Sequence, residues 1–341
     1  MDYVSFFEKR RDLSNLRVYF VWVNLMELSF LLAKEILSLF IIVIVGCLLI
    51  KTHLLTSDDG KVISKLVLYV VCPCTILNAF QIELTQDKLT GLMLSFLGAI
   101  LVHIVYLILT KLLSSVFHFM PVEKASLIYT NAGNLVIPLV SAVLGPEWVF
   151  YTSGYIVIQT ILLWTHGKNT VCNEKTYDIK KIILNINVIA IFIGIVLFLS
   201  RIQLPDILLT TVSSIGSMVG PLSMLVIGML IGHMNFKDIL EEKRTYLICI
   251  LRLIVYPLVM IVIFHLSGMM QLHPYAYEIL MITILAAAAP AAATITQFAQ
   301  LYNKHPGYTS LINVMSVVMC IVTMPLMIMI YEIFLKLIFM S

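Results

Sequence analysis

The sequence predicts an all-α integral membrane protein whose ten transmembrane helices form two inverted repeats of five. Three observations lead to this prediction. The chain has 341 residues, of which 60% are hydrophobic and only 12% are charged, and its mean hydropathy is +1.01. Soluble domains are about 45–50% apolar and about 25% charged. The chain also contains ten apolar runs long enough to cross a bilayer, and prolines recur at matched spacing in its two halves.

The apolar runs define the expected spans, because about 20 apolar residues are needed to cross the hydrocarbon core. The runs are continuously apolar and rich in Leu, Ile and Met, which favours helices over the alternating strands of a membrane barrel. The expected spans are residues 29–50, 64–82, 89–113, 124–144, 147–165, 182–200, 206–232, 245–267, 276–299 and 308–334.

Lysine and arginine are concentrated in the loops that follow odd-numbered spans, and these loops are expected to face the cytoplasm. Both chain ends should then lie outside, with the protein in the plasma (cytoplasmic) membrane. The basic residues within 1–25 conflict with this orientation. Either translation starts naturally at Met26 and residues 1–25 are an extension, which we favour, or this segment is an interfacial amphipathic helix.

The two halves of the chain show an internal repeat of inverted topology. Four positions match in chain order, and they pair the segment Gly46 to Pro73 with Gly194 to Pro221, Pro121 with Pro274, and Pro138 with Pro290. Because each half has five spans, the second half must enter the membrane from the opposite side. The expected domains are a first repeat at 26–165, a short cytoplasmic loop at 166–181 and a second repeat at 182–341.

Two prolines lie inside matching spans, Pro138 in the fourth and Pro290 in the ninth. Proline removes a backbone donor and clashes with the preceding turn, so each helix is expected to kink or unwind there. Interrupted helices at matching positions of inverted repeats point to a transport site at mid-membrane. The half-helix N-termini after the breaks would suit an anionic substrate.

Polar residues beside these prolines are the candidate substrate-binding residues. Asn131 and Asn134 lie three residues apart and therefore on one helical face, where hydrogen bonding between helices is the alternative role, above all for Asn134. Thr294 and Gln297 follow the second proline as candidate polar lining. Arg252 in the eighth span is either functional, or it snorkels to the membrane surface or bonds to a backbone carbonyl.

Composition and motifs exclude several other functions. The formal net charge of +3 is too small for a nucleic-acid-binding surface, so no nucleic-acid partner is expected. The six cysteines lie mostly in apolar runs, and Cys72 and Cys74 lack the spacing of a zinc pair, so no metal site is expected. No phosphate-binding loop is present, which excludes direct use of ATP, and no cofactor is expected.

Two motifs resemble those of the auxin efflux carrier family of membrane transport proteins. Asn131-Ala132-Gly133 ahead of Pro138-Leu139 is similar to the family pattern Asn-Thr-Gly…Gly-Leu-Pro, and Pro290 followed by the sequence FAQLYNKHP is the more specific match. The resemblance extends over residues 26–335. Val136 departs from it, because the family usually has glycine two residues before the first proline.

The resemblance implies an elevator-type carrier, a homodimer, in which the broken helices 4 and 9 cross and bind an organic anion. Asn131 and Pro138 then correspond to the family's crossover asparagine and proline, and Pro290 to the proline of the second repeat. The loop at 166–181 is too short to be the long regulatory loop of many plant auxin carriers. The expected cargo therefore shifts toward small carboxylates such as malate or malonate, as in the bacterial homologues.

We therefore expect a secondary active or facilitative transporter of a small organic anion, with H+, Na+ or no coupling ion, and no enzyme activity. A sodium-coupled symporter of the bile-acid type is one alternative, although the alanines before Pro290 offer no cage for Na+. A membrane enzyme is disfavoured because neither a His-Glu-x-x-His nor a Gly-x-Ser-x-Gly motif is present. A transporter-like sensor is the third alternative, and turnover in liposomes would separate it from a carrier.

Overall fold

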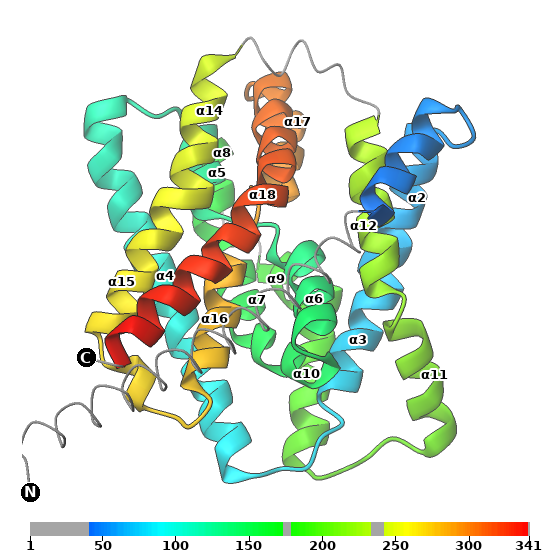
Figure 1. Ribbon diagram of the computed structural model, residues 1–341. Helices are drawn as coiled ribbons and strands as arrows, with labels where there is room; N and C mark the ends of the chain where they lie inside the picture. Colours follow the sequence, from blue (N-terminus) through cyan, green and yellow to red (C-terminus); the bar gives the residue numbers. More distant parts are fainter. Residues whose placement is uncertain (1–40, 173–178, 233–241, 340–341) are drawn as a thin grey trace, which may run out of the picture.

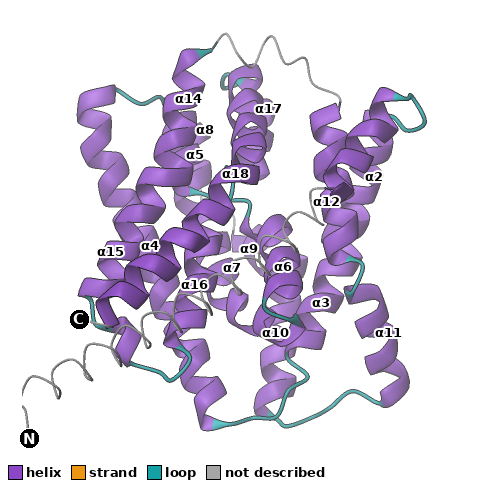
Figure 2. Ribbon diagram, viewed as in Figure 1, coloured by secondary structure: helices purple, strands orange, loops and turns teal. Residues whose placement is uncertain are grey.

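The structure, a computed structural model, describes residues 41–172, 179–232 and 242–339 (Figure 1). Within these ranges all regular elements are helices and no strand is present, as Figure 2 shows. The predicted all-α class is therefore confirmed. The segment 1–25 lies outside the described residues.

The helices follow one another through short turns and breaks. In chain order they are the first helix Ile41–Lys51, α2 Ser57–Leu66, η1 Val67–Val71, α3 Cys72–Ala79, α4 Gln86–Phe117, α5 Pro121–Ile128, α6 Ala132–Val143, η2 Pro146–Tyr151, α7 Thr152–Leu162, η3 Leu163–Gly167, α8 Lys168–Cys172, α9 Ile179–Ile183, α10 Ile186–Leu199, α11 Asp206–Gly216, α12 Val219–Gly232, α14 Lys243–Ile250, η4 Leu251–Val255, α15 Tyr256–Leu266, η5 Met269–Gln271, α16 Ala276–Ala287, α17 Ala293–Leu301 and α18 Pro306–Phe339. From residue 64 onward, the predicted apolar runs fall on these helices.

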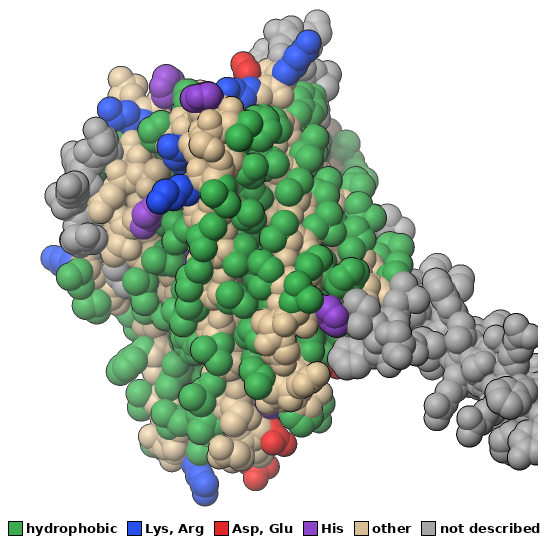
Figure 3. All heavy atoms as spheres, turned by 90° about the vertical axis from the view of Figure 1, so that its left-hand side faces the viewer, with side chains coloured by type: hydrophobic (Ala, Val, Ile, Leu, Met, Phe, Trp, Pro, Cys, Tyr) green, Lys and Arg blue, Asp and Glu red, His purple; other side chains and the backbone are tan. Residues whose placement is uncertain are grey.

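Some of the helical stretches are long and apolar enough to cross a bilayer by themselves. Among the described residues there are five, Asp58–Ala79, Gln86–Phe117, Asp206–Met229, Lys243–Leu266 and Pro306–Phe334. Figure 3 shows one face of the molecule, on which hydrophobic side chains cover the middle and charged ones gather toward the two ends. This surface suits an integral membrane protein, whereas the full set of ten spanning helices stays a prediction.

Two of the long helices widen into a π-helical turn just before a proline. In η1 the N–H of Cys72 bonds to the carbonyl of Val67, and in η4 the N–H of Tyr256 bonds to that of Leu251. Proline follows directly in both helices, where it removes a donor and crowds the preceding turn. The wider turn relieves this conflict, and π-bulges of this kind are frequent at functional sites.

The helices pack in two groups. The scaffold group consists of the first helix, α2, η1, α3 and α10–α12, in which α3 packs against both α10 and α11. The core group consists of α4–α8 and α14–α18 with their connecting turns, in which α4 packs against α7 and α16. Figure 1 shows α2, α3, α11 and α12 on one side of the view and α4, α14, α15 and α18 on the other. The groups meet where η2 packs against α3 and where α6 contacts α12 and α3.

Glycines allow close packing inside the scaffold group. A β-carbon on Gly46 of the first helix would collide with the backbone carbonyl of Leu225 in α12. A β-carbon on Gly228 of α12 would collide with the carbonyl of Val43 in return. The two backbones are therefore in contact, as in the small-residue interfaces of membrane helices, where van der Waals packing replaces the hydrophobic effect.

A buried carboxylate fixes the start of α5 in the core group. Glu123 accepts hydrogen bonds from Arg244 in α14, with Nε–Oε1 2.5 Å and Nη2–Oε2 2.9 Å, and from the hydroxyl of Tyr308 in α18 at 2.7 Å. It also accepts a bond of 2.7 Å from the backbone N–H of Met120. Three helices are thus joined at this carboxylate, so α5 enters the core in a fixed direction.

Candidate functional site

Two helices of the core group are interrupted, and the interruptions meet. The first break covers residues 129–131, between α5 and α6, and the second covers residues 288–292, between α16 and α17. We call these two stretches together the crossover. Such unwound backbone is tolerated at membrane depth only if protein or a water-filled cavity satisfies its polar groups.

The two breaks satisfy each other through an isolated β-bridge between Thr130 and Ala291, whose chains run antiparallel. The N–H of Asn131 donates to the carbonyl of Pro290 at 2.8 Å, and a second bond of 3.0 Å runs from the second break back to the first. Thr130 and Ala291 form the pair that these two bonds flank, so their own N–H and C=O groups point away from each other.

Those outward groups are satisfied by side chains from two other helices. Gln159 of α7 accepts from the N–H of Thr130 at 3.1 Å and donates to its carbonyl at 2.8 Å. Ser316 of α18 accepts from the N–H of Ala291 at 3.0 Å, and Asn313 donates to the carbonyl of Ala291 at 2.8 Å. The crossover therefore has a complete set of hydrogen bonds at both bridge residues.

The first break does not lie at Pro138, where the sequence places it. Pro138 is buried inside α6, which continues as a helix on both sides of it. The residue opposite Pro290 in the crossover is Asn131, so the structure does not bring the two matched prolines together. Pro290 does lie within its break, where proline removes a backbone donor and crowds the preceding turn, and where the small alanines beside it allow the first break to approach closely.

Arg252 links the two half-helices that end at the crossover. Its side chain is 1% exposed and projects from η4, with Nη1 donating to the carbonyl of Leu127 at 2.8 Å and Nη2 to that of Ala289 at 3.1 Å. The guanidinium also lies 5.6 Å from the ring centroid of Tyr106. Carbonyls at helix C-terminal ends carry partial negative charge, which stabilises a buried cation. Among the described residues no carboxylate contacts this guanidinium.

The predicted binding residues lie at the N-terminal ends of the other two half-helices. Asn131 is the N-cap residue of α6 and is half-buried, with no side-chain hydrogen bond that caps the helix. Thr294, also half-buried, is the second residue of α17. Asn134 and Gln297 belong to the early turns of α6 and α17, but their side chains fall outside the described part of the structure. The crossover thus brings the two predicted segments together.

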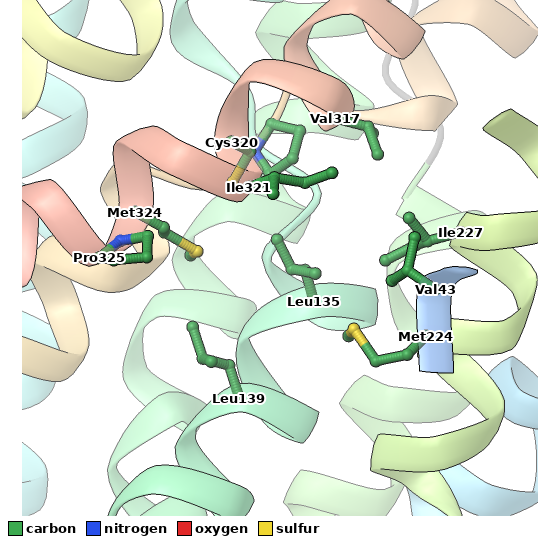
Figure 4. Close-up of a pocket in the computed structure, with 11 residues that line it drawn as sticks. Val43, Leu135, Leu139, Met224, Ile227, Val317, Cys320, Ile321, Met324 and Pro325 are labelled. Carbon is green, nitrogen blue, oxygen red and sulfur yellow. The ribbon is translucent and has the colours of Figure 1, made fainter. Parts of the chain in front are cut away.

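A small apolar cavity of about 50 Å³ adjoins the crossover between the two groups of helices. Figure 4 shows Val43, Met224 and Ile227 of the scaffold group across from Leu135 and Leu139 of α6, with residues of α18 closing another side. Every lining residue has a side chain of carbon and sulfur only. The cavity can therefore contact the apolar part of a ligand but not hydrogen-bond its polar groups.

Comparison of the sequence with known protein families identifies the family to which the chain belongs. The sequence matches the membrane transport protein family over residues 31–175 and 170–328, which together cover most of the chain. The chain belongs to this family. A comparison with curated proteins gives no match.

The membrane transport protein family is a family of transporters and not of enzymes, and it includes the auxin efflux carriers. The resemblance inferred from Asn131, Pro138 and Pro290 is therefore confirmed at the level of the family. The chain is accordingly an integral membrane transporter with a bilayer as its environment.

Sequence reasoning missed Gln159, Asn313 and Ser316, which satisfy the crossover in this membrane transport protein. Each is one of several polar residues within a predicted apolar span, a pattern that is equally typical of hydrogen bonding between helices. Their positions in the last span of each half are the signal that could have indicated matching roles. The sequence does indicate Arg252 as an intramembrane cation, and in the structure it bonds to two backbone carbonyls.

Proposed function

We propose that the protein is a secondary transporter, active or facilitative, of a small organic anion that binds at the crossover. The observation that carries the proposal is that two half-helix N-termini, of α6 and α17, begin on either side of the paired breaks. The first amides of a helix have no carbonyl partner within the helix and bear partial positive charge. Two such ends favour an anionic group.

The charge of Arg252 favours the same class of cargo. A fully buried guanidinium that contacts carbonyls instead of a carboxylate leaves a net positive charge beside the crossover. In a medium of low dielectric constant this charge acts over a longer distance than in water. A carboxylate at the crossover would be stabilised by it, whereas a cation would be repelled.

The proposed mechanism is an elevator-like alternation, in which the core group moves along the scaffold group with the cargo. The glycine-mediated contact of the first helix with α12 gives the scaffold a rigid interface, and the apolar cavity gives the moving surface few hydrogen bonds to break. Ligand pockets commonly hold about 300–1,000 Å³, so the two groups would separate to admit the cargo. A homodimer also belongs to this proposal, and uptake is coupled to H+, to Na+ or to no ion.

Uptake into liposomes tests this proposal. Purified protein is expected to give saturable uptake of at least one of malate, malonate, succinate, lactate and indole-3-acetate. Asn131→Ala should lower the apparent affinity by about 10–100-fold, because a hydrogen bond to a charged group contributes about 1.5–3 kcal/mol. Asn78→Ala, an asparagine of α3 far from the crossover in the chain, serves as the matched control and should behave as wild type.

The alternatives give different results in the same assay. A sodium-coupled symporter of the bile-acid type would require Na+ for uptake of every anion, whereas a sensor would bind an anion without uptake under any ion gradient. Uptake of cations in preference to carboxylates would contradict the proposal.

A further inference from the structure

We propose that the first turn of α6 and Asn187 of α10 form a subsite for a carboxylate that carries a second hydrogen-bonding group, such as a hydroxyl. The subsite lies between the core group and the scaffold group. This inference rests on the proposed function, because it assigns the place where the anionic end of the cargo binds.

The first observation is open space at Gly133, the second residue of α6. A β-carbon added to Gly133 would have one heavy atom within 4 Å, the Nδ2 of Asn187 at 3.9 Å. The carbonyl of Gly133 is in turn 3.9 Å from the thiol of Cys72 in α3. The backbone at Gly133 therefore has room for at least a methyl group, and the scaffold residues Asn187 and Cys72 border it.

The second observation is the state of the Asn187 side chain. Asn187 is 5% exposed, and its Oδ1 is buried without a hydrogen-bond partner among the described residues. Its backbone is held in place, because the side chain of Asn185 caps α10 by accepting from the N–H groups of Asn187 and Val188 at 3.1 and 3.3 Å. A buried amide oxygen without a partner costs about 1–3 kcal/mol, so a ligand or an ordered water that donates a hydrogen bond is expected there.

The chemistry of the two partners defines the ligand class. The N–H groups of the first turn of α6 can only donate, and they favour negative charge. The amide of Asn187 can both donate and accept. A carboxylate oxygen therefore matches the α6 amides and Nδ2, while a hydroxyl matches Oδ1. A hydroxy acid such as malate has both groups, whereas succinate and a simple fatty acid have only the first.

Asn187 belongs to the scaffold group and Gly133 to the core group, so this subsite can be complete in only some positions of an elevator. Leu135 and Leu139 point from α6 into the apolar cavity, whereas Gly133 faces α10. One side of α6 therefore faces the apolar cavity, and another side faces the polar side chain of Asn187.

Gly133→Ala tests the subsite, because the added methyl group would occupy the gap while meeting no backbone atom outside its own helix within 4 Å. We expect the midpoint of thermal unfolding in detergent to stay equal or rise, since alanine favours a helix over glycine. The KM for malate uptake should rise at least tenfold, and the malate-induced shift in thermal midpoint should disappear. Gly307→Ala, early in α18 with nothing within 4 Å, is the matched control and should change neither.

A second pair of measurements tests the role of Asn187 in specificity. Asn187→Asp has the same shape but repels a carboxylate, so it should raise the KM for malate at least tenfold. Asn187→Ala should bring the KM values for malate and succinate together, because only malate offers the hydroxyl that Oδ1 accepts. A loss of packing alone would weaken the binding of both substrates equally and leave the ratio of their KM values unchanged.

The outcomes separate this inference from the proposed function. If wild type takes up carboxylates and both Gly133→Ala and Asn187→Asp retain its KM, the subsite is refuted and the proposed function stands. If wild type shows the malate-induced thermal shift but no uptake, the proposed function is refuted and loss of the shift in Gly133→Ala supports the subsite. If neither malate nor succinate shifts the thermal midpoint of wild type, the subsite is refuted.

Discussion

Arg252→Met is expected to reduce anion uptake by at least about 100-fold while most of the protein still folds. The substitution removes the positive charge beside the crossover and leaves the carbonyls of Leu127 and Ala289 without their donors. Each lost partner costs about 1–3 kcal/mol. Removing a buried charge also removes its desolvation penalty, which offsets part of this cost. The rate of anion uptake should therefore fall strongly, while the free energy of unfolding should fall only modestly.

Initial rates of uptake in liposomes and thermal unfolding in detergent check this prediction together. Arg252→Lys keeps the charge but presents a single ammonium in place of the planar fork, so it should retain part of the activity without bridging both carbonyls as well. Arg201→Met, at an exposed position after α10, is the matched control and should transport normally. If Arg252→Met takes up anions at the wild-type rate, the charge of Arg252 does not contribute to anion selectivity.

Gln159→Leu is expected to give the largest loss of stability among single substitutions around the crossover. It leaves both the N–H and the C=O of Thr130 buried and unpaired, and it also removes the partner of the Thr130 hydroxyl at 2.6 Å. At about 1–3 kcal/mol for each unpaired backbone group, the free energy of unfolding should fall by about 2–6 kcal/mol. Asn313→Leu leaves only the carbonyl of Ala291 unpaired and should cost about half as much.

Thermal and denaturant unfolding of the purified variants measures these differences. Gln159→Met has a length close to that of glutamine but makes none of these hydrogen bonds, so it should lose about as much stability as Gln159→Leu. Gln271→Leu, an exposed glutamine in η5, controls for the change from glutamine to leucine. Equal stability of Gln159→Leu and Gln271→Leu would show that the hydrogen bonds at Thr130 are not needed to hold the crossover.

Local sequence features predicted much of the fold. Continuous apolar runs were enough to place the helices, because helix length and hydrophobicity are set by the bilayer and not by distant contacts. Pro290 correctly indicated the second break, since proline removes a backbone donor and clashes with the preceding turn. The orientation of the termini and the inverted repeat stay predictions.

The first break could not be located from local sequence. Pro138 costs α6 one backbone bond and is accommodated within the helix, whereas residues 129–131 unwind because Ala291 and Gln159 offer them replacement hydrogen bonds from elsewhere in the fold. A break that depends on tertiary partners leaves no proline as a marker. The roles of Asn313 and Ser316 could not be predicted for the same reason, because they depend on contacts with Ala291.

Formation of a disulfide between the two breaks tests whether they cross as described. Residues in the type of bridge formed by Thr130 and Ala291 have Cα atoms about 4.5 Å apart, within the range of about 4.4–6.8 Å that a disulfide spans. The Thr130→Cys, Ala291→Cys double variant in membranes should form this bond under mild oxidation, detected by mass spectrometry of the joined peptides, whereas Thr130→Cys alone should not join to the second break. If the double variant stays reduced at these positions while folding and reaching the membrane as wild type does, the two breaks do not cross as described, and the proposed anion site between them is wrong.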